Sequence, residues 1–218
     1  MSRGRFDERD TIFSRMQLEP GTARYRKYYH ARPGMEKIDA GLRNAPSGVF
    51  SDREPKNSRI ESMFRLIARL RPLARNGYRP AAAEKGHGLQ DREAVLRDLA
   101  LSQGAADFSM TASDPAFFYS VRGRGERYGR RVDEILPTTI IMAFEMDKEM
   151  TAAAPSITET VEVARVYLQA AVCALAIREF IAELGWRAVA HIDGESELVM
   201  PPAAAAAGIG AIGRHGLI

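Results

Sequence analysis

The sequence is almost free of cysteine. Its 218 residues include one, Cys173, which lies in the apolar run of residues 170–175. One thiol forms no disulfide within the chain and cannot supply the thiolate set of a structural zinc site or a [4Fe–4S] cluster. We therefore interpret Cys173 as a buried side chain that fills space in the core, in preference to a nucleophile.

A strong excess of charge of one sign is also missing. The chain has 31 lysine and arginine residues against 28 aspartate and glutamate residues, and its net charge of +3 is too small to indicate a nucleic-acid partner. The basic residues do gather at 24–27, 65–75 and 122–131. Such clusters could meet an anionic ligand or an acidic partner, but a solvent-exposed face is their commoner explanation.

Long uncharged apolar runs are absent too. No such run reaches the roughly 18 residues that a membrane-spanning helix needs, and the amino terminus has the pattern of neither a secretory nor a twin-arginine signal. We therefore expect no membrane span and a cytoplasmic location. With 45% hydrophobic and 27% charged residues, the composition is that of an ordinary globular protein with one main core.

The chain divides into two parts by composition. Residues 1–55 are rich in arginine, tyrosine, proline and glycine and carry few aliphatic side chains. We expect them to form an extended amino-terminal arm, with short helical turns, that lies over the rest of the protein or over a second domain. Residues 56–218 are expected to form the core, which begins with an amphipathic helix over residues 58–73. Pro72 and Gly77 should end that helix.

The middle of the chain predicts a second helix and two strands. Asp91 can cap the helix, and Gly104 should stop it. A short strand is predicted at residues 105–110, where apolar and polar residues alternate. The β-branched, apolar run at residues 138–144 is too short for a typical helix and predicts a buried central strand.

The clearest element is a long helix. Ser156 and Glu159 form a capping box, in which each side chain satisfies a free backbone amide, and residues 161–184 contain neither glycine nor proline. Gly185 should end the helix. Residues 186–192 then predict another buried strand, which would complete a strand–helix–strand crossover of right-handed sense if the strands are parallel. Together these patterns predict an α/β (α+β) fold.

Polar side chains that follow the predicted strands are candidate functional groups. His191 and Asp193 end the last strand and would point to the same side of it. A metal site would need a third ligand, and the candidates nearby have no recognised ligand spacing, so a His–Asp hydrogen bond is the simpler interpretation. Those candidates are Glu195, Glu197 and His215. The acids Glu145 and Asp147 follow the earlier strand and could be functional or only solvated.

A Gly-x-Gly-x-x-Gly pattern occurs at Gly208, Gly210 and Gly213. In dinucleotide-binding folds such glycines follow a strand and open a helix that receives the pyrophosphate. Here the prolines and alanines of residues 201–207 precede them and predict the start of a helix, so nicotinamide binding is disfavoured. The glycines still allow backbone amides to approach a large ligand closely.

Several segments resemble the corrinoid (cobalamin-dependent) reductive dehalogenases. They are GWRAVAHIDG at 185–194 and AGIGAIGRHGLI at 207–218, at the spacing found in that family, with RGR at 122–124, YG at 128–129, AFEMD at 143–147 and ERDTIFSRM at 8–16. The related epoxyqueuosine reductases share the core and a similar Asp and glycine-rich segment. The resemblance covers nearly the whole chain and is most specific after residue 120.

The resemblance implies a nitroreductase-like α/β core that buries cobalamin, followed by a ferredoxin-like domain with two [4Fe–4S] clusters. It implies reductive removal of halide from a small organohalide, with cobalt reduced through those clusters by an electron-donating ferredoxin or reductase domain. Asp193 would lie near the substrate side of the corrin. The residues implied to line the cofactor are Gly208, Gly210, Ile212, Gly213 and Arg214.

The chain departs from that family at the implied proton donor. Where such dehalogenases often carry a tyrosine shortly after the Asp-Gly pair, this chain has Glu195 and Ser196. Ser196 stands at the predicted catalytic position together with Asp193, but its hydroxyl is much less acidic than a phenol. Glu195 or Glu197 could substitute for it.

The second departure concerns the clusters. One cysteine cannot ligate a [4Fe–4S] cluster that needs four, so we expect the chain to end before the cluster-binding cysteines and, by itself, to have no electron path to cobalt. Two alternatives remain open at this point. The chain could be a corrinoid-binding module without catalysis, or a flavin- or nicotinamide-dependent reductase.

Overall fold

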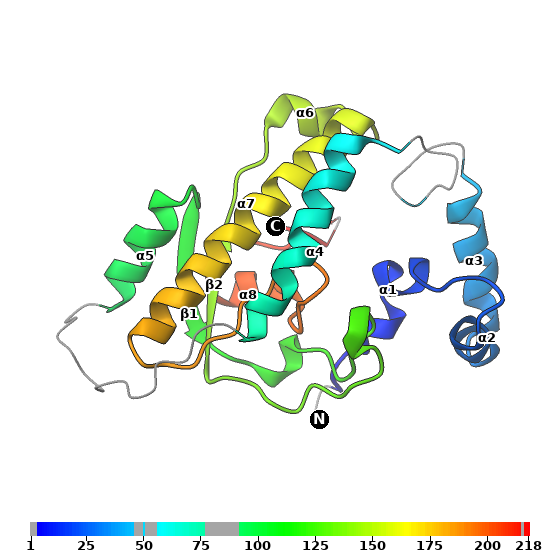
Figure 1. The fold of residues 1–218 in the computed structure, drawn as a ribbon, viewed down its shortest axis with the longest axis horizontal. Helices are drawn as coiled ribbons and strands as arrows, with labels where there is room; N and C mark the ends of the chain where they lie inside the picture. Colours follow the sequence, from blue (N-terminus) through cyan, green and yellow to red (C-terminus); the bar gives the residue numbers. More distant parts are fainter. Residues whose placement is uncertain (1–3, 46–49, 51–55, 77–91, 215) are drawn as a thin grey trace.

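A computed structural model describes residues 4–45, 50, 56–76, 92–214 and 216–218 (Figure 1). The elements near the amino terminus are the 3-10 turn η1 (Glu8–Asp10) and the helices α1 (Ile12–Met16), α2 (Ala23–His30) and α3 (Pro33–Arg43). The remaining elements are α4 (Ser58–Asn76), α5 (Arg92–Ser102), β1 (Asp107–Ala112), η2 (Pro115–Phe117), η3 (Gly125–Arg127), β2 (Thr138–Ala143), α6 (Lys148–Ala152), α7 (Ile157–Glu183) and α8 (Met200–Ala206).

The long helix α7 is the axis of the fold. The serine half of its predicted capping box is confirmed, because the Ser156 hydroxyl accepts a hydrogen bond from the Glu159 amide at 3.2 Å, whereas the Glu159 carboxylate accepts from the Thr160 hydroxyl. After the helix, Gly185 takes a positive φ of 85°, which glycine adopts without the steric cost of a side chain. Figure 1 shows α4 running along one side of α7, and α5 with the two strands on the other.

The contact between α4 and α7 forms one half of the core. Ile67 and Ala74 of α4 are fully buried and pack with Ala171 and Leu175 of α7. Of the two residues predicted to end α4, Pro72 does not, since the helix continues through it to Asn76, and Gly77 lies outside the described residues. A proline costs the helix one amide donor, but its fixed φ is compatible with helical geometry, so the last turn can persist.

The other half of the core lies between α7, α5 and the strands. Leu96, Phe108, Cys173 and Ile177 are its most buried larger side chains. The interpretation of Cys173 as a core residue is confirmed: its sulfur lies 3.6 Å from that of Met142, and burial raises the pKa of the thiol. A buried thiol with a raised pKa is a poor nucleophile.

The α/β (α+β) class is confirmed, with a smaller sheet than expected. β1 and β2 pair antiparallel from Asp107 opposite Ala143 to Ala112 opposite Thr138, and form the one sheet among the described residues. The predicted central strand is therefore half of a two-stranded ribbon. The strand predicted at residues 186–192 does not form, so there is no crossover.

The segment 186–192 is extended but bonds to a helix end. The Ala190 amide donates to the Ala74 carbonyl of α4 at 3.0 Å, which satisfies one of the carbonyls left free where α4 ends. An apolar segment with β-branched residues can bury its side chains against two helices as well as in a sheet. The sequence pattern of this segment therefore does not distinguish a strand from an extended segment packed on helices.

The described part of the amino-terminal arm consists largely of short helices. Leu18, Tyr28 and Tyr29 form a small apolar cluster of their own, and buried Asp39 binds Arg15 at 2.8 Å. The Ser120 amide also donates to the Phe6 carbonyl, so the start of the arm runs along the core. The division of the chain at residue 55 stays a prediction.

Helix α7 is the candidate membrane span of the described residues. It has 27 residues with a hydropathy of 1.5, which is long and apolar enough to cross a membrane by length and composition alone. Only 33% of the most apolar 18-residue stretch of this helix is buried inside the structure. Burial in the protein core therefore does not account for all of its apolar surface. The expected absence of a membrane span stays a prediction.

The packing of α4 gives a matched pair of variants. Ile67→Ala removes a fully buried side chain at the α4–α7 contact and should lower the free energy of unfolding by about 2–4 kcal/mol. Leu66→Ala, at the neighbouring residue that is 44% exposed, should cost less than about 1 kcal/mol. Urea denaturation followed by circular dichroism measures both. Equal losses in the two variants would contradict this packing.

Candidate functional site

The predicted site residues around Asp193 lie in a tight turn after the segment 186–192. The Glu195 amide donates to the Ile192 carbonyl at 2.9 Å, and Gly194 takes a positive φ of 76°. A Cβ atom at Gly194 would collide with the guanidinium group of Arg71 on α4. The turn therefore needs glycine for its conformation and for the close approach of the arginine.

Arginines hold Asp193 from two sides. Arg71 donates from Nε to the Asp193 carbonyl at 2.9 Å and from Nη2 to the carboxylate at 3.3 Å. Arg124 donates to the other carboxylate oxygen at 3.2 Å. The two arginines come from segments more than fifty residues apart, so the carboxylate of Asp193 ties α4 to the loop after β1.

Glu195 and Glu197 are held in the same way by a second pair of arginines. Arg75, one turn after Arg71 on α4, pairs with Glu195 and lies 2.8 Å from Glu197. Arg127 donates to Glu197 at 2.5 Å and lies 3.5 Å from Glu195. The three acids of the turn therefore each face two arginines.

Glu8 from the amino-terminal arm completes this arrangement. Its side chain is fully buried and accepts hydrogen bonds from the Gly123 amide at 2.7 Å and from Arg124 Nε at 2.9 Å, while Arg122 Nε lies 3.2 Å away. A Cβ atom on Gly123 would collide with the backbone of Glu8 and Arg9. The segment 122–124 therefore contacts the arm in two ways. Its arginines bind the Glu8 carboxylate, and Gly123 lets the backbone of the arm approach closely.

Arg122 is the most enclosed charge of the site. It has no exposed surface, and its Nη2 donates to the Gly194 carbonyl at 3.0 Å. Burial lowers its pKa, against the opposing effect of Glu8 and of the two other glutamates. Its Nη1 has no hydrogen-bond partner among the described residues. We call these charges around the turn the arginine–carboxylate network. Its ion pairs form two sets, which are Arg71, Arg122 and Arg124 with Glu8 and Asp193, and Arg75 and Arg127 with Glu195 and Glu197.

His191 does not bind Asp193, so the simple His–Asp hydrogen bond predicted from the sequence is wrong. Its Nδ1 accepts from the Glu197 amide at 3.2 Å instead. Burial lowers the pKa of His191 to about 4, and the nearby charges of Arg75 and Arg122 act in the same direction. The imidazole is therefore neutral at pH 7. The described residues contain no group that could hold a metal ion, and His215 lies outside them.

Two further predicted polar groups have local structural roles. The Ser196 hydroxyl is buried, donates to the Leu198 carbonyl at 3.0 Å and accepts from the Leu198 amide at 3.2 Å, which closes the turn. Asp147 caps α6 by accepting from the Met150 amide at 2.8 Å. A catalytic role of Asp193 and Ser196 stays a prediction.

The glycine-rich segment follows α8 with the opposite polarity to a dinucleotide motif. Gly208 takes a positive φ of 79°, and the Ile209 amide bonds back to the Ala204 carbonyl at 3.0 Å, so the first glycine ends a helix. Among the described residues no helix begins after these glycines, so there is no helix amino terminus that could bind a pyrophosphate. The motif therefore does not support nicotinamide binding. The residues predicted to line a cofactor are all exposed: Gly208, Gly210, Ile212, Gly213 and Arg214.

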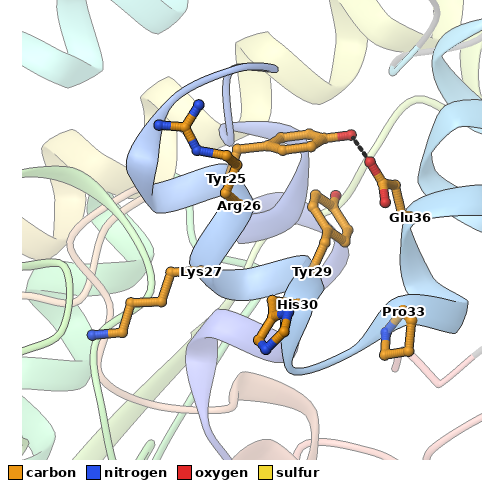
Figure 2. Close-up of a pocket in the computed structure, with 7 residues that line it drawn as sticks. All are labelled: Tyr25, Arg26, Lys27, Tyr29, His30, Pro33 and Glu36. Atoms are coloured by element: carbon orange, nitrogen blue, oxygen red, sulfur yellow. Dashed lines mark hydrogen bonds between the residues drawn. The ribbon is translucent and has the colours of Figure 1, made fainter.

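A separate hollow lies between α2 and α3, away from these residues (Figure 2). It has a volume of about 690 Å³ and is lined from α2 and α3, and Tyr25 there donates to Glu36 at 2.8 Å. Figure 2 shows Arg26 and Lys27 pointing away from Glu36. The basic side chains therefore do not converge into this hollow, and it contains none of the predicted site residues.

The chain was compared with known proteins by sequence and by fold, and only the fold comparison finds matches. No family model and no curated protein matches the chain. The chain is similar to a solved reductive dehalogenase described with a mechanism for B12-dependent dehalogenation, with a TM-score of 0.61 and 23% identity. It is also similar to the catabolic reductive dehalogenase NpRdhA bound to 3-bromo-4-hydroxybenzoic acid, with a TM-score of 0.60 and 23% identity.

The chain has the fold of part of a reductive dehalogenase. The similarity covers 71% of this chain, but the chain corresponds to 22% of the first solved protein and 23% of the second. The resemblance seen in the sequence is thereby confirmed at the level of the fold.

The use of the arginines in this fold is not evident from the sequence. A solvent-exposed face is the commoner explanation of the basic clusters at 65–75 and 122–131, yet arginines from both meet the turn at Asp193. The ion pairs of Glu8 with the second cluster are not predicted by the sequence either. The available signal was the excess of arginine over lysine in both clusters, since arginine is preferred for buried pairs with carboxylates.

Tyr167 of α7 is another residue that the sequence did not single out. Its ring lies 6.2 Å from that of Phe64 on α4. Burial raises the pKa of its phenol, and the charge of Asp193 raises it further. A protonated phenol therefore lies within electrostatic range of Asp193, on the helix that forms the axis of the fold.

Removing the buried acid of the network tests its structural weight. Glu8→Ala would leave Arg122 and Arg124 without their shared counter-charge, so we expect a loss of about 3–5 kcal/mol in the free energy of unfolding. Glu19→Ala removes an exposed acid from the same arm and should change it by less than about 0.5 kcal/mol. Chemical denaturation distinguishes the two. A loss at Glu8 as small as at Glu19 would show that the network is not formed.

The buried histidine predicts a pH dependence of stability. Because the pKa of His191 is lowered to about 4 in the folded state, the unfolded state takes up a proton first as the pH falls below about 6.5. The resulting loss of folding stability is absent above pH 6.5 and grows as the pH falls towards 4. His191→Gln should lose about 1–2 kcal/mol less stability than the wild type between pH 7 and pH 5. His30→Gln, at an exposed position, should behave as the wild type.

Proposed function

We propose that the chain is the cobalamin-binding portion of a reductive-dehalogenase-like oxidoreductase. The whole enzyme would remove halide from an organohalide, consuming two electrons and one proton and releasing halide and the reduced carbon compound. The observation that carries the proposal is the fold similarity over 71% of the chain to B12-dependent dehalogenase structures. When bound, cobalamin supplies a cobalt centre able to exchange electrons with a carbon–halogen bond.

The residues after α8 fit a cofactor with many amide groups. The backbone amides of Gly210, Ala211 and Ile212 donate no hydrogen bond within the described chain. These three adjacent amides are free to donate, and Gly210 and Gly213 on either side of Ala211 and Ile212 have no side chain. The amides can therefore donate to acceptor groups on the edge of a corrin at close range. Arg214 is exposed next to them. We assign these residues, with Gly208 and Gly213, to cofactor binding.

The acids of the turn at Asp193 serve the substrate side in this proposal. Arg71 and Arg124 fix the Asp193 carboxylate, so it can orient a bound molecule without rearranging. Burial alone would raise the pKa of Glu197, but Arg75 and Arg127 outweigh it and lower the pKa. A carboxylate held in its ionised form is a poor proton donor, which disfavours Glu197 as a substitute for a catalytic phenol.

The electrons would come from outside the described residues. One buried cysteine cannot hold a [4Fe–4S] cluster, so the proposal includes clusters and an electron-donating ferredoxin or reductase domain beyond this chain. A small organohalide is the proposed substrate. A cytoplasmic location and the absence of a nucleic-acid partner are retained as predictions.

Cobalamin titration of the purified chain tests the proposal. We expect a saturable change in the absorbance of hydroxocobalamin on binding. Gly210→Val places a branched side chain beside the free amides, where it meets only the flexible side chain of Ile218, and should weaken binding by about tenfold or more. Gly41→Val, at a glycine in open space on α3, should leave binding unchanged.

A parallel titration with flavin mononucleotide separates the alternatives. Cobalamin binding without flavin binding supports the proposal. Flavin binding in place of cobalamin would contradict it and favour a flavin-dependent reductase on the same fold. Equal loss of cobalamin affinity in Gly210→Val and Gly41→Val would overturn the assignment of the glycine-rich segment.

A further inference from the structure

The two-stranded ribbon of β1 and β2 is covered by helices on both faces. Residues opposite each other in an antiparallel pair point to the same face, and the opposite residues Met110 and Ile140 both pack against α5 and α7. On the other face Ile141 packs against α8, and the Ser109 hydroxyl donates to the Ala207 carbonyl at 2.6 Å. The ribbon therefore has only its two edges left for pairing.

The edge of β1 carries its own protection. The Phe108 amide donates to the Asp107 carboxylate at 2.7 Å, so a side chain occupies the place of a strand partner. Arg97 of α5 lies over the Phe108 ring and 3.7 Å from the same carboxylate. Charged side chains at an edge strand oppose the addition of another strand.

The edge of β2 has no such protection. The Ser113 amide donates to the Pro137 carbonyl at 2.9 Å in continuation of the ribbon, so the odd-numbered residues are the ones that bond between the strands. The amides and carbonyls of Thr138, Ile140 and Met142 therefore point outward, and they bond to no other described residue. β2 also contains no charged residue and no proline. Unpaired backbone groups on an uncharged edge favour the addition of a further strand.

Helix α7 extends past the ribbon with apolar side chains that the two strands do not cover. Cys173 and Ile177 pack in the cluster with the strands, and Val166 and Ala170 lie on the same side of the helix at successive turns. Val166 and Ala170 are only half-buried. Figure 1 shows α5 on one side of the strands and the amino-terminal half of α7 extending to the other. A strand added at β2 would lie beneath this half of α7.

We propose that the edge of β2 accepts one extended β-strand from the remainder of the enzyme, outside residues 1–218. The proposal rests on the function proposed above, in which the chain is one portion of a reductive-dehalogenase-like enzyme. The matched region is 22% of a solved dehalogenase, so most of such an enzyme is available to supply the strand. That strand meets α7 on one face and the side of α8 on the other, so its side chains are apolar on both faces.

A second copy of this chain fits the edge less well. In an antiparallel pairing of β2 with itself, opposite side chains point to the same face, so both copies place α7 on one face of the joined sheet. The amino-terminal half of each α7 would then meet a ribbon that the other copy's α7 already covers. The half-buried side chains of Val166 and Ala170 fit a strand that brings no helix of its own.

Amide hydrogen exchange, measured by NMR on the ¹⁵N-labelled chain, tests the edge. The probe is a synthetic peptide with the β2 sequence TTIIMA between terminal lysine pairs. Without the peptide, the Ile140 and Met142 amides should exchange about tenfold or more faster than those of Thr139 and Ile141, which bond to β1. Saturating peptide should slow Ile140 and Met142 by about tenfold or more and leave Met110 unchanged.

Two proline variants form a matched pair. Met110 and Ile140 lie opposite each other, are both half-buried, and point their amides away from the neighbouring strand. Ile140→Pro removes an outward amide without removing a bond between β1 and β2, and should weaken peptide binding about tenfold or more. Met110→Pro makes the same change on the protected edge and should stay within about twofold of the wild type. Fluorescence anisotropy of the labelled peptide measures both, and circular dichroism checks that both variants fold.

The outcomes separate the strand site from the function. Peptide that protects neither Ile140 nor Met142, or equal losses of binding in two folded proline variants, would overturn the strand site. Protection of these amides that appears without peptide and increases with protein concentration would overturn the chosen occupant in favour of a second copy. Peptide binding by a chain that fails to bind cobalamin would support the strand site and overturn its assignment to a dehalogenase.

Discussion

The ion pair of buried Glu8 with Arg122 and Arg124 is the contact on which the rest of the site depends. A carboxylate without exposed surface is stable only where donors surround it, and here two guanidinium groups and the Gly123 amide do so. Arg124 passes the constraint on to Asp193, and Arg122 to the carbonyl of Gly194. Glu8, near the amino terminus, thus helps to position a turn almost two hundred residues later.

The helix pair α4 and α7 supplies the rigid support for that network. Their contact buries Ile67 and Ala171, and it places Arg71 and Arg75, one turn apart, at the carboxyl end of α4. Side chains four residues apart lie on the same face of a helix, so both arginines reach the turn together. This chain therefore positions the charged residues of the turn through the carboxyl end of α4, and the two-stranded ribbon lies on the other side of α7.

The sequence predicts well the features that depend on a few neighbouring residues, such as helix ends. It does not predict which distant segment another segment packs against or pairs with. The cap at Ser156, the stop at Gly104 and the burial of Cys173 follow from a few neighbouring residues. The segment 186–192 has the composition of a strand, but it bonds to the end of α4 and packs on α4 and α7 instead of joining the ribbon. Whether an apolar extended segment pairs with a sheet or packs on helices is set by what lies beside it.

By itself, the sequence determined the class of the fold, the main helices and a family resemblance that the solved dehalogenase structures match at the level of the fold. Only the tertiary structure decided what the charged residues do. Arginines in a charged run have the same local pattern whether they face water or a buried acid, because their partners lie up to 122 residues away in the chain. Glu8 and Asp193 become one site only when the folded core brings Arg124 between them and removes most of the solvent from their side chains.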